Sequence, residues 1–103
     1  MRKLIKVTQK HINKGRRAYA DSCPIALAVQ EQAPKDGFVF HLCHNHGAYY
    51  AIDKETGKVL DGMYTKDVKY EYIPSTRVAN FINKFDKLGK KAVKPFNFYL
   101  ELT

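Results

Sequence analysis

The sequence predicts an α+β fold, a single compact domain over residues 1–103 in which a mostly antiparallel sheet of four to five strands packs with about three helices. Length is the first reason, because 103 residues have room for one core. Composition is the second, since 45% hydrophobic and 27% charged residues are typical of a globular domain. The third is periodicity: helical spacing and period-two segments follow one another in the order β-α-α-β-β-β-α-β, without regular βαβ units.

The N-terminal part is expected to contain the end of a strand at Val7 and then a brief helix. Thr8 is a favoured N-cap residue and Gly15 a favoured C-cap residue, and two turns of helix fit between them. Residues 16–21 then form a connecting loop.

A second helix is expected from Ser22, which is placed as its N-cap. Pro24 falls in the first turn, where its missing N–H removes no helical hydrogen bond. Residues 25–29 leave little polar face, so we expect the core to surround this helix.

Three strands are expected in the middle of the chain. Residues 38–43 alternate with period two. Residues 49–52 and 59–60 flank the turn-forming stretch 53–58, the pattern of a hairpin. A further strand is expected over 68–73, where Pro74 ends it.

The clearest helix covers residues 76–88, with Ser75 or Thr76 as its cap and Gly89 just past its end. Its apolar residues recur at spacings of three and four and are expected to face the core: Val78, Phe81, Ile82, Phe85 and Leu88. Residues 96–102 alternate cleanly and predict a terminal strand.

The positive charge is concentrated near the two ends of the chain. Eighteen Lys and Arg residues against ten Asp and Glu give a net charge of +8. Residues 1–20 contain no acid, and residues 84–94 contain five lysines against Asp86. If the two stretches meet in space, they form a positive surface that attracts polyanions. The alternative is that the lysines keep the domain soluble and protect its strand edges.

Seven tyrosines accompany these basic residues. Tyr can stack on a nucleic-acid base or anchor a protein interface, although most are expected to be half-buried strand residues. Tyr19 is the first choice for a functional ring because it stands beside Arg16 and Arg17. The candidate residues for binding an anionic ligand are Lys10, Lys14, Arg16, Arg17, Tyr19, Lys90, Lys91 and Lys94.

The densest polar cluster, residues 41–47, raises the question of a metal site. Thiolate and imidazole are usual zinc ligands, and the candidate set would be Cys23, Cys43, His44 and His46. The spacing disfavours this set, because no C-x-x-C or H-x-x-x-H pair occurs. We therefore expect no metal, with the histidines on a turn and Cys43 as a small buried apolar side chain.

The two cysteines are expected to be free thiols, and Cys23 is the better candidate for a reactive one. A helix N-terminus favours thiolate, although the alternative for Cys23 is a helix-start residue that faces the core. None of the patterns G-x-S-x-G, H-E-x-x-H and G-x-x-x-x-G-K-[ST] occurs. We expect a protein without enzymatic activity and without a cofactor.

No apolar run approaches the roughly 18 residues that a membrane helix needs, and the N-terminus lacks the apolar region of a signal peptide. The expected location is therefore the cytoplasm, with no membrane partner.

Two motifs stand in the N-terminal third, V-T-x-x-H-I-x-x-G from Val7 to Gly15 and C-P-I-A-L-A from Cys23 to Ala28. In these motifs, and more loosely through residues 81–86 and 94–98, the chain resembles a group of small uncharacterised bacteriophage and prophage proteins. The resemblance implies a phage accessory protein in the cytoplasm of a bacterial host and transfers no catalytic residue. Small phage proteins of this kind often bind a host component, such as a nuclease complex or a nucleotide signal used in defence.

Three functional hypotheses follow from the sequence. The first is a module that binds an anionic partner, either nucleic acid or a phosphorylated small molecule, through a basic face. The second is a protein antagonist that docks on a host defence factor through strand edges or tyrosines. The third and weakest is a metal- or thiol-dependent enzyme built on the Cys and His residues. A homodimer is a further hypothesis, because residues 96–102 would offer a pairing strand at a sheet edge.

Overall fold

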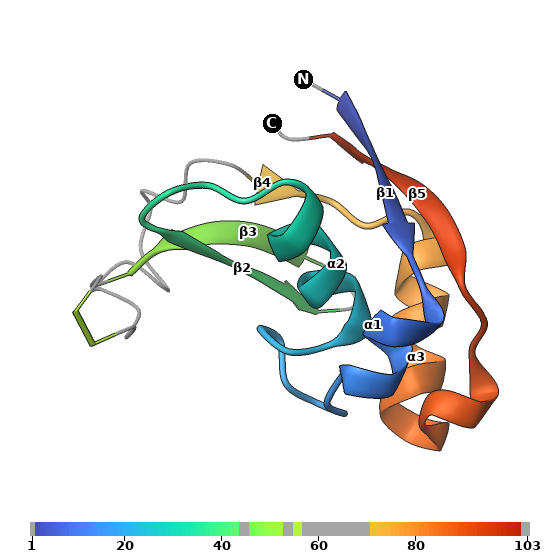
Figure 1. Cartoon of the computed structure of the whole chain (residues 1–103). Helices are drawn as coiled ribbons and strands as arrows, with labels where there is room; N and C mark the ends of the chain where they lie inside the picture. Colours follow the sequence, from blue (N-terminus) through green and yellow to red (C-terminus); the bar gives the residue numbers. More distant parts are fainter. Residues whose placement is uncertain (1, 44–45, 53–54, 57–70, 102–103) are drawn as a thin grey trace.

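The described strands form two antiparallel sheets in the computed structural model, which describes residues 2–43, 46–52, 55–56 and 71–101 (Figure 1). The elements in chain order are β1 (Arg2–Val7), α1 (Gln9–Lys14), α2 (Pro24–Gln32), β2 (Phe38–Cys43), β3 (His46–Ala51), β4 (Glu71–Tyr72), α3 (Thr76–Leu88), the 3₁₀ helix η1 (Lys90–Ala92) and β5 (Phe96–Glu101). The α+β class and its three α-helices are thus as the sequence predicts.

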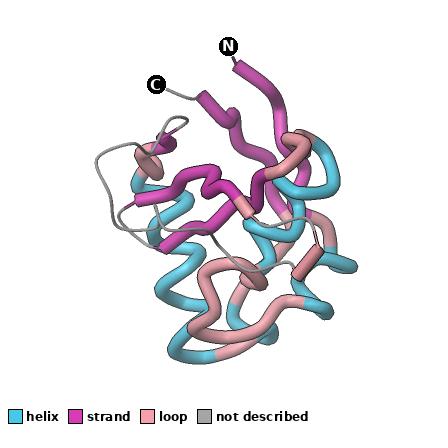
Figure 2. Tube along the Cα trace, turned by 90° about the vertical axis from the view of Figure 1, so that its left-hand side faces the viewer, coloured by secondary structure: helices cyan, strands magenta, loops and turns pink. Residues whose placement is uncertain are grey.

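The division of the strands differs from the expected sheet of four to five strands. β1 pairs with β5 in one sheet, and the other sheet has the order β2-β3-β4. Between β4 and β5 the contact is made by side chains, since the rings of Tyr72 and Phe98 lie 5.8 Å apart. β4 and β5 are therefore in contact without being paired in one sheet. Both sheets cover the same hydrophobic core. Figure 2 shows β5 between β1 and β4 when the molecule is viewed from the side.

The terminal sheet explains why the two ends of the chain meet. The register pairs Arg2 with Glu101, Ile5 with Phe98 and Val7 with Phe96. Every second side chain enters the core, so Ile5 and Phe98 are buried while Asn97 is exposed. The predicted strand 96–102 is confirmed as far as Glu101, where the described residues end.

Helix α1 begins after Thr8 and ends at Gly15, as expected. Gly15 has an extended backbone with φ −64°, so a left-handed turn is not the reason for glycine here. A Cβ at this position would lie 2.6 Å from the ring of Pro24. The glycine allows α1 and the start of α2 to touch.

The expected N-cap of α2, Ser22, is wrong by one residue. The cap is Cys23, whose sulfur accepts a hydrogen bond from the Ala26 N–H at 3.4 Å, and Pro24 is the first helical residue. Proline fixes its own φ at a helical value and restricts the residue before it to extended backbone, which is the N-cap conformation. Cys23 adopts it, with φ −68° and ψ 159°.

The middle strands are confirmed in part. β2 is the predicted strand 38–43, and its antiparallel partner β3 begins at His46 instead of residue 49. Of the predicted strand 68–73, Glu71–Tyr72 form β4, Ile73 lies past the end of this strand, and residues 68–70 lie outside the described residues. The predicted hairpin 53–58, apart from residues 55 and 56, and the strand 59–60 lie outside the described residues.

Helix α3 has the predicted bounds, with Ser75 as its cap and Gly89 at φ 87° past its end. Four residues of the apolar stripe are buried, namely Val78, Phe81, Ile82 and Phe85. Leu88 is an exception, since it is 70% exposed. The last turn of the helix therefore extends past the core into solvent. Gly89 follows this turn, and the chain changes direction there.

Candidate anion-binding site

A groove of about 440 Å³ lies between α3 and the segment that leads from η1 into β5. We call it the basic groove. Its polar lining consists of three cations and one amide, and the rest is apolar: Arg77, Asn80, Lys84 and Lys94, with Phe81, Ala92, Val93, Pro95 and Phe96. Its volume is in the range of pockets that hold small organic ligands.

Helical spacing places the α3 residues in one row. Positions 80 and 81 are each three or four residues from positions 77 and 84, so all four share a face of the helix. Phe81 belongs both to this row and to the buried stripe. The row therefore runs along the border between core and solvent, with Arg77 and Lys84 exposed.

The floor of the groove is aromatic. The rings of Phe81 and Phe96 lie 4.9 Å apart and are tilted by 32°. The guanidinium carbon of Arg77 stands 5.4 Å from the centre of the Phe96 ring, within the range of a cation–π contact. Arg77 thus lies over the aromatic floor, and Lys84 and Lys94 line the same groove.

Among the described residues, no carboxylate lines the basic groove or forms an ion pair with Arg77, Lys84 or Lys94. Lys10 provides the contrast, because its ammonium lies 3.7 Å from a carboxylate oxygen of Glu31. The charges of the groove are consequently available to an anionic ligand.

The residues named from the sequence do not gather in one place. Lys94 lies in the basic groove, and Lys90 and Lys91 lie next to it along the chain, on η1. Lys14, at the end of α1, is exposed. Lys10 does not line the groove and lies beside Glu31 of α2.

Arg16, Arg17 and Tyr19 stand in the loop that contacts the end of α3. The Arg17 guanidinium donates to the carbonyls of Asp86 at 3.0 Å and Lys87 at 2.6 Å. The guanidinium of Arg16 lies 5.4 Å from the centre of the Tyr19 ring. The N-terminal basic stretch therefore does touch the C-terminal one, but Arg17 serves mainly to hold the two together.

Sequence reasoning missed Arg77, Asn80 and Lys84 as site residues, together with the rings of Phe81 and Phe96. The signal was present in the spacing, because a polar row at 77, 80 and 84 adjoins the apolar stripe of the same helix. The charge distribution along the chain points to Lys84 and Lys94 but not to Arg77, which stands outside both basic stretches.

The cysteines and histidines form no metal centre among the described residues, where no group of three Cys, His, Asp or Glu could hold an ion. His44 of the candidate set lies outside that part of the chain. Cys43 is exposed rather than buried, and its thiol donates to the carbonyl of His46 at 3.3 Å. It stands at the end of β2, where the alternation turns its side chain away from the core.

Cys23 is a core residue with 3% of its surface exposed. Burial raises the pKa of its thiol to about 11, and the hydrogen bonds from the Ala26 and Ile25 N–H groups only partly oppose this. The sulfur is therefore protonated at neutral pH, and the helix N-terminus does not turn it into a thiolate.

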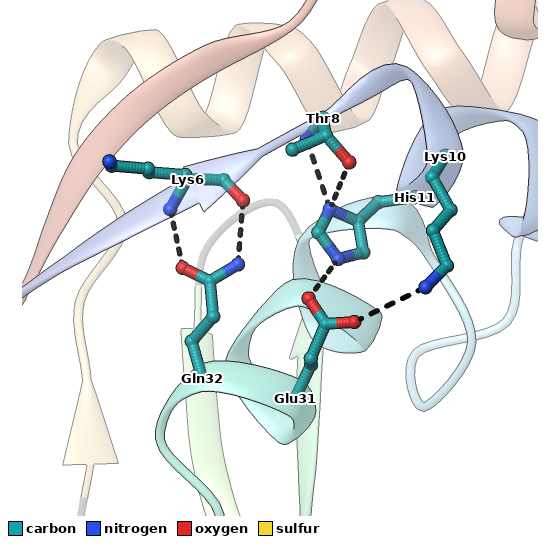
Figure 3. A network of polar contacts seen from close by, with 6 residues as sticks. All are labelled: Lys6, Thr8, Lys10, His11, Glu31 and Gln32. Carbon is teal, nitrogen blue, oxygen red and sulfur yellow. Dashed lines mark hydrogen bonds and ion pairs between the residues drawn. The ribbon is translucent and has the colours of Figure 1, made fainter.

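A buried histidine links α1 to α2 (Figure 3). The Nδ1 of His11 accepts a hydrogen bond from the Thr8 N–H at 2.9 Å, so the other ring nitrogen carries the proton. That nitrogen, Nε2, donates to Glu31 at 2.9 Å. The Thr8 hydroxyl lies 3.0 Å from the same Nδ1. The Thr8 hydroxyl, the His11 ring and the Glu31 carboxylate thus form one hydrogen-bonded chain. This chain caps the N-terminus of α1 and connects α1 to α2.

In the part of the chain that the structure describes, no helix has the length and apolar character needed to cross a membrane. Comparison with known proteins identifies no relative: no family model, curated protein or solved structure matches this chain.

Proposed function

We propose that this protein binds a phosphate-bearing ligand with a flat base, a nucleotide or single-stranded nucleic acid, in the basic groove. The observation that carries the proposal is the combination of three cations, free of carboxylate partners among the described residues, with the half-buried ring of Phe96 in the lining of the same groove. Phosphate attracts Lys and Arg, and a base can stack on an aromatic ring.

The role of each residue follows from its chemistry. Lys84 and Lys94 supply point charges for phosphate oxygens, and Arg77 can donate two parallel hydrogen bonds to one phosphate. Phe96 offers its ring to a base, and the Asn80 amide can donate to or accept from the edge of that base. None of these roles needs a metal or a reactive thiol. The resemblance to phage proteins supports a non-enzymatic accessory role in the cytoplasm of a bacterial host.

The test is a binding measurement with two probes at about 50 mM salt, where electrostatic affinity is strong. One probe is a fluorescein-labelled single-stranded oligonucleotide, and the other is a set of ribonucleotides followed by thermal shift. In the variant K84Q/K94Q we expect at least a tenfold loss of affinity. For the single strand, two fewer cations should also reduce the slope of log K against log salt by about 1.4.

The matched control is K10Q/K14Q, which removes the same charge from α1. We expect it to keep most of the affinity. These two lysines are outside the groove, so their loss weakens only the long-range electrostatic attraction, to which the other positive charges of the protein still contribute. Equal losses in the two double variants would show a diffuse charge effect and overturn the groove as the site. No binding of either probe at 50 mM salt would overturn the function itself.

A further inference from the structure

A second groove, which we call the edge groove, runs along β5 and is bordered by residues of β1, of β5 and of the segment from β4 to the start of α3. It encloses about 840 Å³ and is lined by Leu4, Tyr72, Ile73, Ser75, Arg77, Asn97, Phe98, Tyr99 and Glu101. Among the described residues, five large hydrophobic side chains are exposed, and three of them lie here: Leu4 at 39%, Tyr99 at 52% and Ile73 at 61%. Exposed apolar groups gathered at one place mark an interaction surface.

The backbone of β5 is open toward this groove. The N–H and C=O of Lys6 are both bonded to the side-chain amide of Gln32, at 2.7 Å each, and therefore point away from β5. Lys6 stands opposite Asn97. In an antiparallel pair such a position leaves the backbone groups of both residues pointing outward, and the pattern repeats every second residue.

Asn97, Tyr99 and Glu101 consequently turn their N–H and C=O groups outward from the sheet. No described residue bonds to them there, because β4 meets β5 through side chains. An edge with unpaired groups is a template for one further strand. Exposed rings and aliphatic groups beside that edge would cover such a strand.

The two ends of the edge groove carry opposite charges. Arg77 lies at the start of β5, with its guanidinium over the Phe96 ring, and Glu101 lies at the end of the strand. A strand that fits must have an acidic group at one end, matching Arg77. The β5 strand of a second copy meets this requirement when it lies antiparallel to the first β5, because the Glu101 of the second copy is then near the Arg77 of the first.

We propose that β5 pairs antiparallel with β5 of a second copy of this chain, in a register centred on Tyr99. Asn97 of each copy then stands opposite Glu101 of the other, and the two Tyr99 residues face each other. Each Glu101 carboxylate lies at the Arg77 end of the opposite groove. The two-stranded sheets join into one of four strands, β1-β5-β5-β1, around a twofold axis, the commonest symmetry of homo-oligomers.

The register also covers the apolar groups. Phe98 and Leu100 face inward from β5, so those of the second copy would approach Tyr72 and Ile73 on the inner wall of the groove. Tyr99 carries the guanidinium of Arg2 on its ring at 3.9 Å, which leaves the opposite ring face for the second Tyr99. The exposed side chains of the edge groove thereby gain apolar neighbours.

The test is the mass in solution of the ligand-free protein, measured by sedimentation over about 1 to 100 µM. We expect a reversible dimer, twice 11.9 kDa. In E101R an arginine faces Arg77 of the other copy, and in R77E a glutamate faces Glu101. Each single variant should raise the dimer dissociation constant at least tenfold, while R77E/E101R restores opposite charges and should recover most of the pairing.

K91E is the matched control, because it reverses one exposed charge on η1 outside the edge groove. It should leave the dimer intact. Circular dichroism of every variant shows whether it is folded. A wild-type monomer at 100 µM would overturn the proposal, and so would a dimer that the single reversals leave unchanged or that the double variant fails to recover. If the wild-type protein is a monomer and binds an unrelated peptide in extended conformation, the partner of the edge groove is another protein and the dimer is overturned.

Discussion

Gly15 and Pro24 show how the motif residues of the N-terminal third act at the scale of single atoms. Their contact leaves no room for a methyl group, since a Cβ on residue 15 would meet the Pro24 ring at 2.6 Å. Thr8 and His11 cap α1, and Cys23 caps α2. These parts of both motifs hold two helices together, and none of them lies in the basic groove.

Replacing Gly15 with alanine should destabilise the fold by about 1–3 kcal/mol, because the added methyl group forces the α1–α2 contact apart. Chemical denaturation in urea measures the loss. The control is the same substitution in a Pro24→Ala background, where the ring atoms are gone and the extra cost should shrink. An equal cost in both backgrounds would contradict the steric explanation.

Glu31 provides a prediction for pH. The hydrogen bond from His11 lowers the pKa of its carboxyl below the usual 4.5, and the nearby charge of Lys10 lowers it further. Ionised Glu31 therefore stabilises the folded state above its unfolded pKa, and this contribution disappears as the pH falls through the lowered folded value. The stability difference between wild type and Glu31→Gln should be clear at pH 7 and nearly absent at pH 2.

Urea denaturation at both pH values measures that difference. Glu55→Gln, which removes an exposed carboxylate outside α1, α2 and both grooves, is the control and should show a smaller change between the two pH values. A constant difference for Glu31→Gln would mean that its ionisation is not coupled to folding.

At the scale of elements, the loop after α1 and the end of α3 hold each other by reciprocal bonds. Arg17 donates to the last carbonyls of α3, and the Asp86 carboxylate accepts from the Ala18 N–H at 3.0 Å. Ala18 adopts a left-handed φ of 62°, which directs its N–H toward that carboxylate. The cation also lies at the negative end of the helix dipole.

Arg17→Ala should therefore cost about 1 kcal/mol of stability, from lost charged hydrogen bonds and dipole contact at an exposed site. Arg16→Ala removes the same charge from the neighbouring residue and should cost less than half as much, since Arg16 only stacks on Tyr19. Thermal and urea unfolding of the pair separates a specific capping role from a loss of positive charge. Equal costs would contradict the capping role.

Periodicity was enough to predict α3, β2 and β5, because each has a face that the core requires to be apolar. It could not divide the strands between two sheets, since pairing depends on residues far apart in sequence. The expected cap of α2 falls one residue early, because Ser is a common cap residue whereas Pro24 confines the residue before it to the extended N-cap conformation. The basic groove does not follow from the apolar stripe of α3, because its other wall comes from residues 92–96, which the fold brings against the polar border of that stripe.

At the scale of the whole molecule, Arg77 borders both grooves. In the proposed dimer the two Phe96 residues would stand about 20 Å apart, six strand residues at about 3.4 Å each. A single strand of nucleic acid could then reach both basic grooves and gain affinity from its second contact, whereas a mononucleotide could not. A stronger effect of E101R on oligonucleotide binding than on nucleotide binding would follow.

The amide of Gln32 has a consequence for how far such an assembly can grow. It occupies the backbone of Lys6 on the outer side of β1, where a further strand would have to bond. Lysine and arginine side chains of β1 flank the rest of that border and repel an identical border. A further strand therefore cannot add to the outer edge of β1. Because only the β5 edge of this sheet can pair, the assembly stops at a dimer and does not grow into a fibre.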